Sequence, residues 1–258
     1  MRTVIAAMLG LAGLASLAAS PASAQRAVPR SEPAVPFKAG ERLTYDVSWS
    51  SVLVAGTATA TVVEKKPSSN STAYYIVAEG RPLPILAKLY KLYYKMDTLI
   101  DSYTLLPQRA SVYSEEGGQH RSHETTFDRP AHRAAYESRT TSTFKSDLTI
   151  APDVQDALSA LYVLRAVPLK AGDRMTMPIS DSGKNYKMVL QVTGPERMRT
   201  VLGEMGVWKL RPALYDADNQ PVGRDVNIWL SDDERRLPVK LAGNLPLGSF
   251  VLTLREAK

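Results

Sequence analysis

All three histidines of this chain fall in one short stretch, QHRSHETTFDRPAH, together with two carboxylates. The stretch contains His120, His123, Glu124, Asp128 and His132, and these residue types are common zinc ligands. His120 and His123 would share a face of a helix, but on a strand residues three apart point to opposite faces. The stretch reads as a strand and is rich in arginine, so we expect a solvent-exposed basic face and no metal site.

Two acidic stretches could also carry chemistry. YDADNQPVG, from 215 to 223, resembles a calcium-binding loop through its carboxylate and amide oxygens. Gln220-Pro221 breaks that pattern and no glutamate stands at its twelfth position, so a hairpin turn is expected. Asp232, Asp233 and Glu234 could serve as acid and base catalysts, but they follow an apolar run, where exposed turn carboxylates are common.

Known catalytic signatures are missing from the sequence. There is no Gly-x-Ser-x-Gly, His-Glu-x-x-His or phosphate-binding loop, and there is no cysteine. Thiol chemistry and cysteine metal sites are therefore excluded. We expect a protein that is not an enzyme and that needs no cofactor, while an unrecognised hydrolase stays open as a further hypothesis.

A tyrosine-rich segment is the more distinctive feature. In RPLPILAKLYKLYYK, tyrosines crowd together with leucine and isoleucine, so that apolar groups stand on both sides of the segment. These side chains could fill a core beside the central helix described below, or they could line a ligand site. The residues that we predict to line such a site are Leu83, Ile85, Leu86, Leu89, Tyr90, Tyr93, Leu158, Leu161 and Tyr162.

One segment has a clear helical period, PDVQDALSALYVLRAVPLKAGD from Pro152 to Asp173. Val154, Leu158, Leu161 and Arg165 share one helix face, and neighbouring alanines and leucines widen it. An apolar surface this wide is typical of a helix that is covered on several sides. We therefore predict one long helix wrapped by a curved antiparallel sheet.

The rest of the chain reads as short strands separated by turns. Alternating apolar and polar residues, with Gly-Gly, Arg-Pro and similar turn pairs, predict an antiparallel, mainly β fold. A short helix over 85–92 is possible before a strand at 93–101. The other expected strands are 43–49, 57–63, 74–79, 106–116, 119–128, 132–141, 174–179, 187–193, 199–202, 207–215, 225–230, 237–241 and 249–255.

The chain also repeats part of itself. KAGERLT at 38–44 matches KAGDRMT at 170–176, and Leu-Pro pairs follow, with Pro107 67 residues after Gly40 and Pro238 66 residues after Gly172. Common turn chemistry could produce each match separately, but the two spacings differ by only one residue. We therefore expect two related halves of the sheet on either side of the helix.

The N-terminus predicts export. Residues 1–24 have a charged start, an apolar run and Ala22-Ser23-Ala24, as in a signal peptide cleaved after Ala24. The alternative is a membrane anchor, but the apolar run is shorter than the roughly 20 residues that span a bilayer. Residues 25–36 read as a proline-rich linker and residues 37–258 as a single β-rich domain. A periplasmic protein without a transmembrane segment after cleavage is expected.

The formal net charge is +6 and the sequence pI is about 9.4. Such values can indicate nucleic-acid binding, but the basic residues are dispersed and the chain is expected to be exported. We predict no nucleic-acid partner and only a weak attraction to anionic surfaces of the cell envelope.

Three stretches together resemble a known family. PFKAGERLTYDVSW with AGTATATV, DALSALYVLR with KAGD, and WLSDDERRLPVKL are similar to the exported bacterial family called domain of unknown function 3108. The resemblance covers about residues 36–256. It implies no reaction and no catalytic residues. It does imply a fold like the half-barrel of outer-membrane lipoprotein carriers, with a helix in the concavity of the sheet.

These observations leave three functional hypotheses. The first is a non-enzymatic periplasmic protein that binds or carries an apolar envelope molecule, such as a lipid or a lipoprotein-like ligand. The second is an interaction module that docks an envelope protein through a sheet edge or its basic face. The third is the unrecognised hydrolase. A cavity lined by apolar groups favours the first, a filled cavity with a large exposed apolar patch favours the second, and carboxylates and histidines that converge in a pocket favour the third.

Overall fold

The computed structural model describes residues 31–49, 53–223, 225–245 and 248–258. The signal peptide predicted for residues 1–24, with its cleavage site, lies outside these residues. In chain order the elements are β1 (Arg42–Trp49), β2 (Leu53–Ser68), β3 (Ser71–Pro82), α1 (Pro84–Ala87), β4 (Leu92–Asp101), β5 (Pro107–Glu116), β6 (Gln119–Asp128), β7 (Arg133–Arg139), β8 (Thr143–Thr149), α2 (Ala157–Ala166), β9 (Arg174–Asp181), β10 (Lys184–Thr200), β11 (Gly203–Tyr215), β12 (Pro221–Val222), β13 (Val226–Ser231), β14 (Pro238–Leu245) and β15 (Gly248–Ala257).

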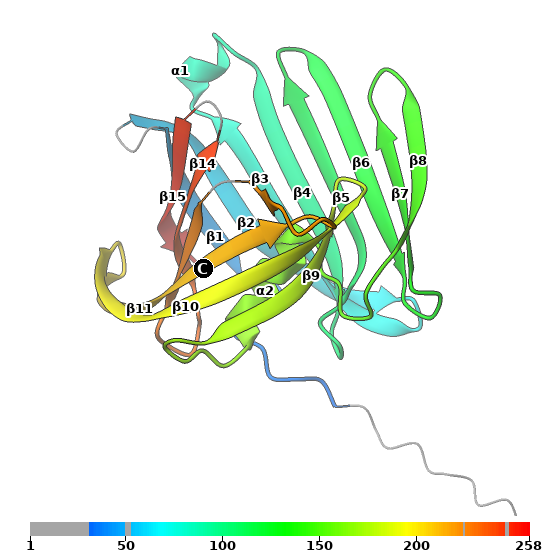
Figure 1. The fold of residues 1–258 in the computed structure, drawn as a ribbon. Helices are drawn as coiled ribbons and strands as arrows, with labels where there is room; N and C mark the ends of the chain where they lie inside the picture. Colours follow the sequence, from blue (N-terminus) through cyan, green and yellow to red (C-terminus); the bar gives the residue numbers. More distant parts are fainter. Residues whose placement is uncertain (1–30, 50–52, 224, 246–247) are drawn as a thin grey trace, which may run out of the picture. The chain divides into compact units, whose positions relative to one another are not determined.

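The strands of Ser31–Lys258 form one curved antiparallel sheet (Figure 1). Its order is β8-β7-β6-β5-β4-β3-β2-β1-β15-β14-β13-β11-β10-β9, and β12 pairs with β11 alone. Within the described residues the edge strands β8 and β9 do not pair with each other, so the sheet is not closed. A half-barrel fits this arrangement, and the prediction of a mainly β, antiparallel fold is confirmed.

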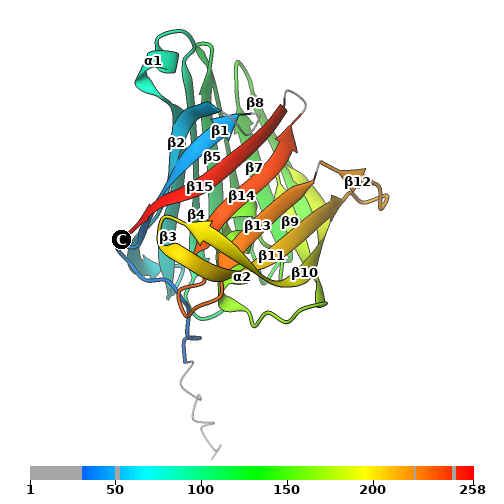
Figure 2. The ribbon, with the colours of Figure 1, turned by 90° about the vertical axis from the view of Figure 1, so that its left-hand side faces the viewer.

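The first and last strands pair in the middle of the sheet (Figure 2). β1 runs antiparallel to β15, with Leu43 opposite Ala257 and Trp49 opposite Phe250. Arg42 N–H donates to the carbonyl oxygen of Lys258 at 3.1 Å, and Lys258 N–H donates back at 2.9 Å. The sheet is therefore continuous across the two ends of the described domain.

The helix α2 begins later than the sequence predicts. It starts at Ala157, and Asp156 caps it: the Asp156 carboxylate accepts N–H bonds from Leu158 at 2.8 Å and Ser159 at 3.0 Å. The Ser159 hydroxyl accepts in turn from the Asp156 N–H at 2.9 Å, which completes a capping box. The predicted start at Pro152 is therefore wrong, because these cap bonds fix the first turn at Asp156.

Contacts on both sides of α2 explain its short length. Gln155 forms an isolated parallel bridge with Ile179 of β9, which keeps the chain extended before the cap. Val167 at the other end is extended and precedes Pro168, and the residue before a proline disfavours the helical region. The helix has ten residues, so the long helix of the prediction is not confirmed.

Side chains of α2 enter two hydrophobic clusters. Leu158 and Tyr162 pack with apolar side chains of β2, β3 and β4, while Ala160 and Leu164 pack with those of β9, β10, β11 and β13. All four are at most 5% exposed. Leu161, predicted to lie on the same buried face, is only half-buried at the edge of the second cluster. The helix thus contacts both halves of the sheet.

The two turns of the predicted repeat have the same conformation and bonds. Gly40 and Gly172 have φ values of 91° and 87°, which glycine adopts without steric cost. The Gly40 N–H donates to the carbonyl of Val62 at 2.8 Å, and the Gly172 N–H donates to that of Val192 at 2.9 Å. These glycines therefore hold equivalent strand-to-strand contacts.

The prolines of the repeat also occupy matching places. Pro107 is the first residue of β5 and Pro238 the first of β14, where the missing N–H does not interrupt a ladder. Two residues earlier, Leu105 and Arg236 both have positive φ, at 57° and 45°. Each proline thus stands at a strand start after a residue with positive φ, and the relation between the two halves stays a prediction.

Most of the predicted strands lie inside or overlap observed ones, with two clear differences. β2 and β10 are much longer than expected, at 16 and 17 residues. β8 and β12 have no counterpart in the prediction. The expected short helix before β4 is present, but α1 covers only four residues.

The last residues of the predicted linker, 31–36, contact the sheet. Glu32 forms an ion pair with Lys65 and accepts a hydrogen bond from the Ser102 hydroxyl at 2.8 Å. Val35 packs against the cluster that contains Leu158. This segment is therefore bound along the outside of the core and continues into β1.

Candidate functional site

The three histidines do not converge. His120 lies on the outer face of β6, where its Nδ1 is 2.7 Å from the Tyr113 hydroxyl. His123 lies on the inner face, with its ring 5.7 Å from that of Tyr136, and His132 stands in the turn before β7. Within the described part of the chain no group of three histidine, aspartate or glutamate side chains could hold a metal ion.

The acidic stretches stabilise their own turns. The Asp216 carboxylate accepts N–H bonds from Asp218 at 3.0 Å and Gln220 at 2.8 Å. The Asp233 carboxylate accepts from the N–H groups of Arg235 and Arg236 at 3.0 and 3.1 Å. These carboxylates therefore serve as turn-forming groups of the kind that Asp commonly supplies.

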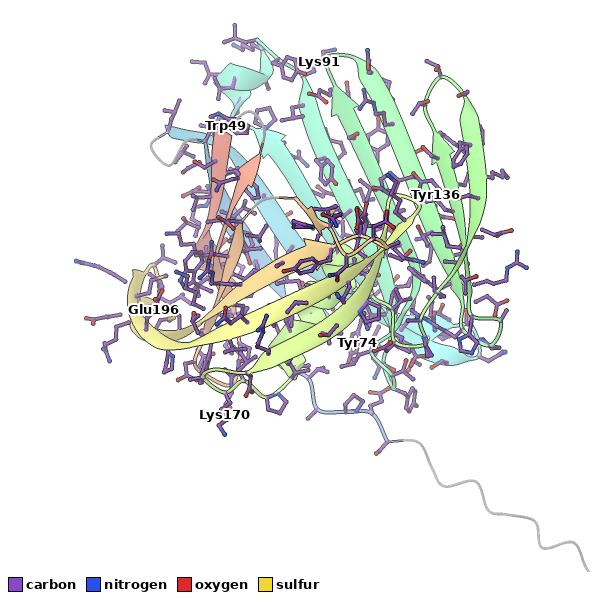
Figure 3. All side chains as sticks on the ribbon, in the orientation of Figure 1. Trp49, Tyr74, Lys91, Tyr136, Lys170 and Glu196 are labelled. Carbon is purple, nitrogen blue, oxygen red and sulfur yellow. The ribbon has the colours of Figure 1, made fainter. Side chains whose placement is uncertain are left out.

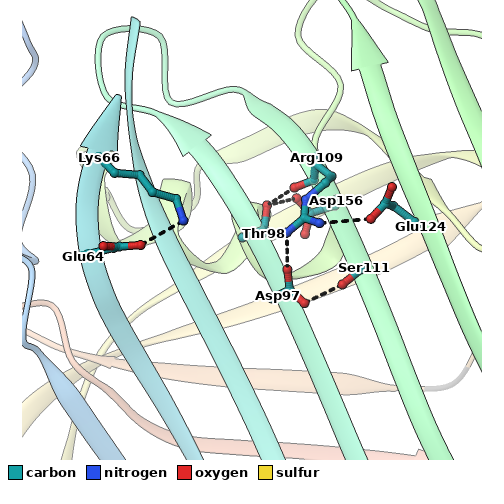
Figure 4. Close-up of polar contacts among 8 residues, drawn as sticks. All are labelled: Glu64, Lys66, Asp97, Thr98, Arg109, Ser111, Glu124 and Asp156. Atoms are coloured by element: carbon teal, nitrogen blue, oxygen red, sulfur yellow. Dashed lines mark hydrogen bonds and ion pairs between the residues drawn. The ribbon is translucent and has the colours of Figure 1, made fainter. Parts of the chain in front are cut away.

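Ion pairs and hydrogen bonds join side chains of neighbouring strands (Figure 4). On the outer face Arg109 bridges Asp97 and Glu124, each at 3.0 Å, and Asp97 is hydrogen-bonded to Ser111. On the inner side the Thr98 hydroxyl donates to the helix cap Asp156 at 2.7 Å. These contacts link strands to one another and to α2.

A buried ion pair ties α2 to the start of β1. The Arg165 guanidinium donates to both carboxylate oxygens of Glu41, at 2.6 and 2.8 Å. It also donates to the carbonyls of Pro36, Arg235 and Arg236, at 3.2–3.3 Å. Arg165 borders an open depression of about 610 Å³, but its donors are engaged in these bonds. The pair is structural.

The residues predicted to line a ligand site fall into two separate sets. Leu83–Tyr94 lies at the end of the sheet that carries α1, and α2 lies toward the opposite end (Figure 1). In the first set Ile85 is 72% exposed and Leu89 is 82% exposed, and α1 has no buried residue. In the second set Leu158 and Tyr162 are buried in a filled cluster. The structure does not bring the two sets together.

The inner face of the sheet has an exposure gradient along its strands. In β1, Leu43 and Tyr45 are buried, Val47 is half-buried and Trp49 is 39% exposed. Because alternate residues of a strand point to one face, all four belong to the same face as the core. That face is therefore filled at one end and accessible at the other.

The same gradient recurs in β4. Ile100 and Thr98 are buried, Met96 is half-buried and Tyr94 is 43% exposed. Tyr94 belongs to the inner face by this alternation, and burial, together with proximity to the carboxylate of Asp181, raises the pKa of its hydroxyl. The accessible end of β4 is thus at the same end of the sheet as that of β1.

The gradient is also present in strands far from β4. In β15, Leu254 is buried and Leu252 and Phe250 are half-buried, and Phe250 stands opposite Trp49. In β8 the inward-facing Phe144 is 60% exposed. We call this accessible region the open inner face, and it comprises Val47, Trp49, Tyr94, Met96, Phe144, Phe250 and Leu252.

The individual residues predicted to line the site include none of these side chains, although the predicted tyrosine-rich segment contains Tyr94. The prediction named Tyr93, but the register of β4 puts Tyr93 on the outer face, where its ring lies 6.0 Å from that of Tyr113. Counting back by twos from Ile100, an apolar residue of the predicted strand, would have selected Tyr94. No local signal could have placed Phe144 on the same face of the sheet, because four ladders separate β8 from β4.

Comparison with known protein families identifies the family of this chain. The family model described as a protein of unknown function, DUF3108, matches residues 44–255. The chain belongs to the DUF3108 family. The matched residues of this DUF3108 protein include the whole of the open inner face and the strand starts at Pro107 and Pro238. No curated protein matches the chain in sequence.

One solved structure resembles this DUF3108 protein in fold, and two others match it with lower TM-scores. A β-barrel-like protein of the DUF1849 family from Brucella abortus has a TM-score of 0.53 at 11% identity, over 86% of this chain and 98% of that one. A protein from Bacteroides fragilis, provisionally described as exported with a YmcC-like fold, has a TM-score of 0.33 at 12% identity, over 88% and 100% of the two chains. A provisionally described lipoprotein from Parabacteroides distasonis has a TM-score of 0.36 at 9% identity, over 88% and 100%.

The helices of this DUF3108 protein are short. Among the residues that the structure describes, no helix has the length and apolar character needed to cross a membrane.

Proposed function

We propose that this protein is a non-enzymatic, periplasmic carrier or binding protein for an apolar envelope molecule, and that the open inner face is its site. The observation that carries the proposal is the gradient along the inward-facing side chains. In β1, β4 and β15 the inward-facing side chains are buried at one end of the sheet. The aromatic and aliphatic side chains that follow them on the same face are accessible at the other end.

Physical reasoning connects this gradient with a ligand. A concave apolar surface in contact with water costs free energy, and monomeric proteins seldom keep such a surface unless it binds something. Ligand sites combine an apolar lining with a few polar groups, and here the Tyr94 hydroxyl and the imidazole of His123 would supply them. A lipid chain, being apolar and flexible, suits such a surface.

The architecture that we infer for this function has two related halves wrapped around α2. The equivalent turns at Gly40 and Gly172 and the equivalent prolines support a duplicated sheet. In this arrangement α2 and its two clusters form a rigid base below the site. Leu158, Leu161 and Tyr162 would then act as the base of the site, beneath the ligand.

The segment Leu83–Tyr94 would cover the site from one side. Its α1 turn buries no side chain, and prolines at positions 82 and 84 remove two backbone donors. Segments with few buried contacts open locally at low free-energy cost, as release of a ligand requires. Export by the predicted signal peptide would place the carrier among envelope lipids.

A pair of adjacent tyrosines allows a sharp test of this function. Tyr94→Asp places a carboxylate on the open inner face, whereas Tyr93→Asp places one on the outer face of the same strand. The affinity for a fluorescent fatty acid, measured by titration, should fall by more than about tenfold for Tyr94→Asp, because a buried charge against an acyl chain is strongly unfavourable. Tyr93→Asp should retain the wild-type affinity.

Urea unfolding of both variants provides the control for folding. If the wild type binds no such probe, or if both variants lose binding equally while remaining folded, the carrier hypothesis fails. The envelope interaction module would then become the leading hypothesis, and its candidate contact surfaces would be the edge strands β8 and β9.

A further inference from the structure

Many of the large exposed apolar side chains in the described part of the chain lie at one end of the sheet. Trp49 and Leu53 face each other across the β1–β2 connection, and the Leu83 N–H donates to the carbonyl of Ala55 at 2.9 Å, which holds the α1 segment beside β2. We call the exposed apolar groups of this end the apolar rim. They are Trp49, Leu53, Ile85, Leu89, Tyr90 and Leu92, with exposed fractions between 39% and 82%.

Basic groups accompany the apolar rim. Residues 81–94 contain Arg81, Lys88 and Lys91 and no acidic residue. Arg81 pairs with Glu79 at 3.0 Å, whereas Lys88 and Lys91 are exposed and form no ion pair within the described residues. Figure 3 shows Lys91 and Trp49 at this end and Lys170 at the opposite one.

The turn between β5 and β6 brings acidic side chains close to the apolar rim. Glu116, at the end of β5, accepts a hydrogen bond from the Tyr90 hydroxyl at 3.0 Å. Its neighbour Glu115 is half-buried. The charged side chains of residues 81–94 are therefore all positive, and they stand among the leucines and tyrosines of this segment.

We propose that the apolar rim docks on the surface of an anionic lipid bilayer. Leucine and isoleucine side chains on a short projecting segment can enter the acyl boundary, and tryptophan and tyrosine favour the headgroup region. Lysines beside them attract anionic headgroups. Ligand transfer is the one part of this inference that rests on the proposed function. Trp49 belongs to both the open inner face and the apolar rim, so the two surfaces are continuous. A lipid would therefore pass between the bilayer and the protein without crossing water.

The charge distribution favours a bilayer over a protein surface. Lysine is depleted in the cores of protein–protein interfaces, yet Lys88 and Lys91 stand within the apolar rim. In a two-fold contact between copies of this chain the same patch meets itself, which would bring these lysines close to their own counterparts. An anionic lipid surface avoids both costs.

Vesicle co-sedimentation, without any fatty acid, tests the docking. Protein purified from expression of the full chain should bind vesicles containing phosphatidylglycerol and bind phosphatidylcholine vesicles much more weakly. Leu89→Asp should reduce binding at least tenfold. Lys88→Glu with Lys91→Glu should reduce it by about 25-fold or more, since each basic residue contributes about fivefold near an anionic surface.

The chain offers a matched control at another turn. Val201 and Leu202, at the tip between β10 and β11, are 57% and 45% exposed, and Val201→Asp with Leu202→Asp should leave vesicle binding unchanged. All substituted side chains are exposed, and urea melts should show unchanged stability. Three results would overturn the proposal: no binding by the wild type, loss of binding only in the control variant, or a dimer that Leu89→Asp dissociates in place of vesicle binding.

The docking and the carrier function fail in distinguishable ways. Tyr94→Asp, on the open inner face, should lose fatty-acid uptake and still bind vesicles. Retained uptake without vesicle binding in the wild type would remove the docking alone. Vesicle binding without uptake would remove the carrier function and leave the docking in place.

Discussion

Arg165 is the largest fully buried side chain among the described residues, and its charge is neutralised by Glu41 alone. Phe37 and Tyr162 lie near its guanidinium, at 5.5 and 5.0 Å from ring centroid to charge centre. Arg165 therefore joins α2 to the residue before β1 by an ion pair. It joins α2 to the turn before β14 by hydrogen bonds to main-chain carbonyls. The sequence placed Arg165 on the buried face of a helix but gave no sign of its distant partner.

Removing this arginine should be costly. Arg165→Met leaves the Glu41 carboxylate buried without a partner, and we expect a loss of about 3–5 kcal/mol in the free energy of unfolding. Urea denaturation measures it. Arg255→Met, which breaks the exposed pair with Asp46, should cost only about 0–1 kcal/mol and is the control. Equal losses in the two variants would contradict the role assigned to Arg165.

Acidification should destabilise the protein through His123. Burial lowers its pKa below the ordinary value of 6.5, and the carboxylate of Asp181 offsets part of this effect. The folded protein thus binds the proton less tightly than the unfolded chain, so this contribution to stability is complete above about pH 6.5 and is lost as the pH falls toward the folded-state pKa.

Urea midpoints between about pH 7 and pH 5 check this dependence. His123→Phe keeps an aromatic ring beside Tyr136 and should flatten the pH dependence, while His120→Phe, on the outer face, should not. Parallel pH profiles for the wild type and His123→Phe would show that another group causes the dependence.

At the scale of elements, α2 allows a direct comparison of two leucines. Leu158 is 5% exposed within a filled cluster, so Leu158→Ala should lower the free energy of unfolding by about 2–5 kcal/mol. The sequence predicted the same burial for Leu161, but that side chain is only half-buried and Leu161→Ala should cost clearly less. Urea melts of both variants measure the difference, and equal costs would mean that Leu161 is as tightly packed as Leu158.

The strands could be predicted where one face is apolar and the other polar. β1 and β4 show this alternation, and their predicted bounds are close to the observed ones. β8 could not be found, because TFKSDLT carries only Phe144 and Leu148 as large apolar residues and reads as a polar loop. It is an edge strand, and such strands keep charged and polar residues that discourage further pairing.

The length of α2 could not be predicted from periodicity. Val154 fits the helical pattern but packs with Phe127 and Ile150 from outside the helix. The bridge from Gln155 to β9 competes with helix formation at this point. A tertiary contact therefore overrides a local pattern that extends further in the sequence.

At the scale of the whole molecule, the two matching sequence stretches were the most informative signal. They mark local turns, in which a glycine with positive φ and a proline at a strand start leave a readable pattern. The candidate site had no such pattern. Its side chains come from β1, β4, β8 and β15, and only the sheet order brings them to one face. The predicted site residues stay a prediction, divided by the structure into a rim and a filled core.

The pairing of β1 with β15 bears on how the chain reaches its folded state. Every other ladder of the described sheet joins strands close in sequence, so these hairpins can form early and locally. The β1–β15 ladder joins residues about two hundred positions apart and needs both ends of the domain. Until β15 is complete, the two halves of the sheet each have an unpaired edge at the centre. β15, which follows all the other described strands along the chain, is thus the strand that joins two half-sheets with exposed edges into a single sheet.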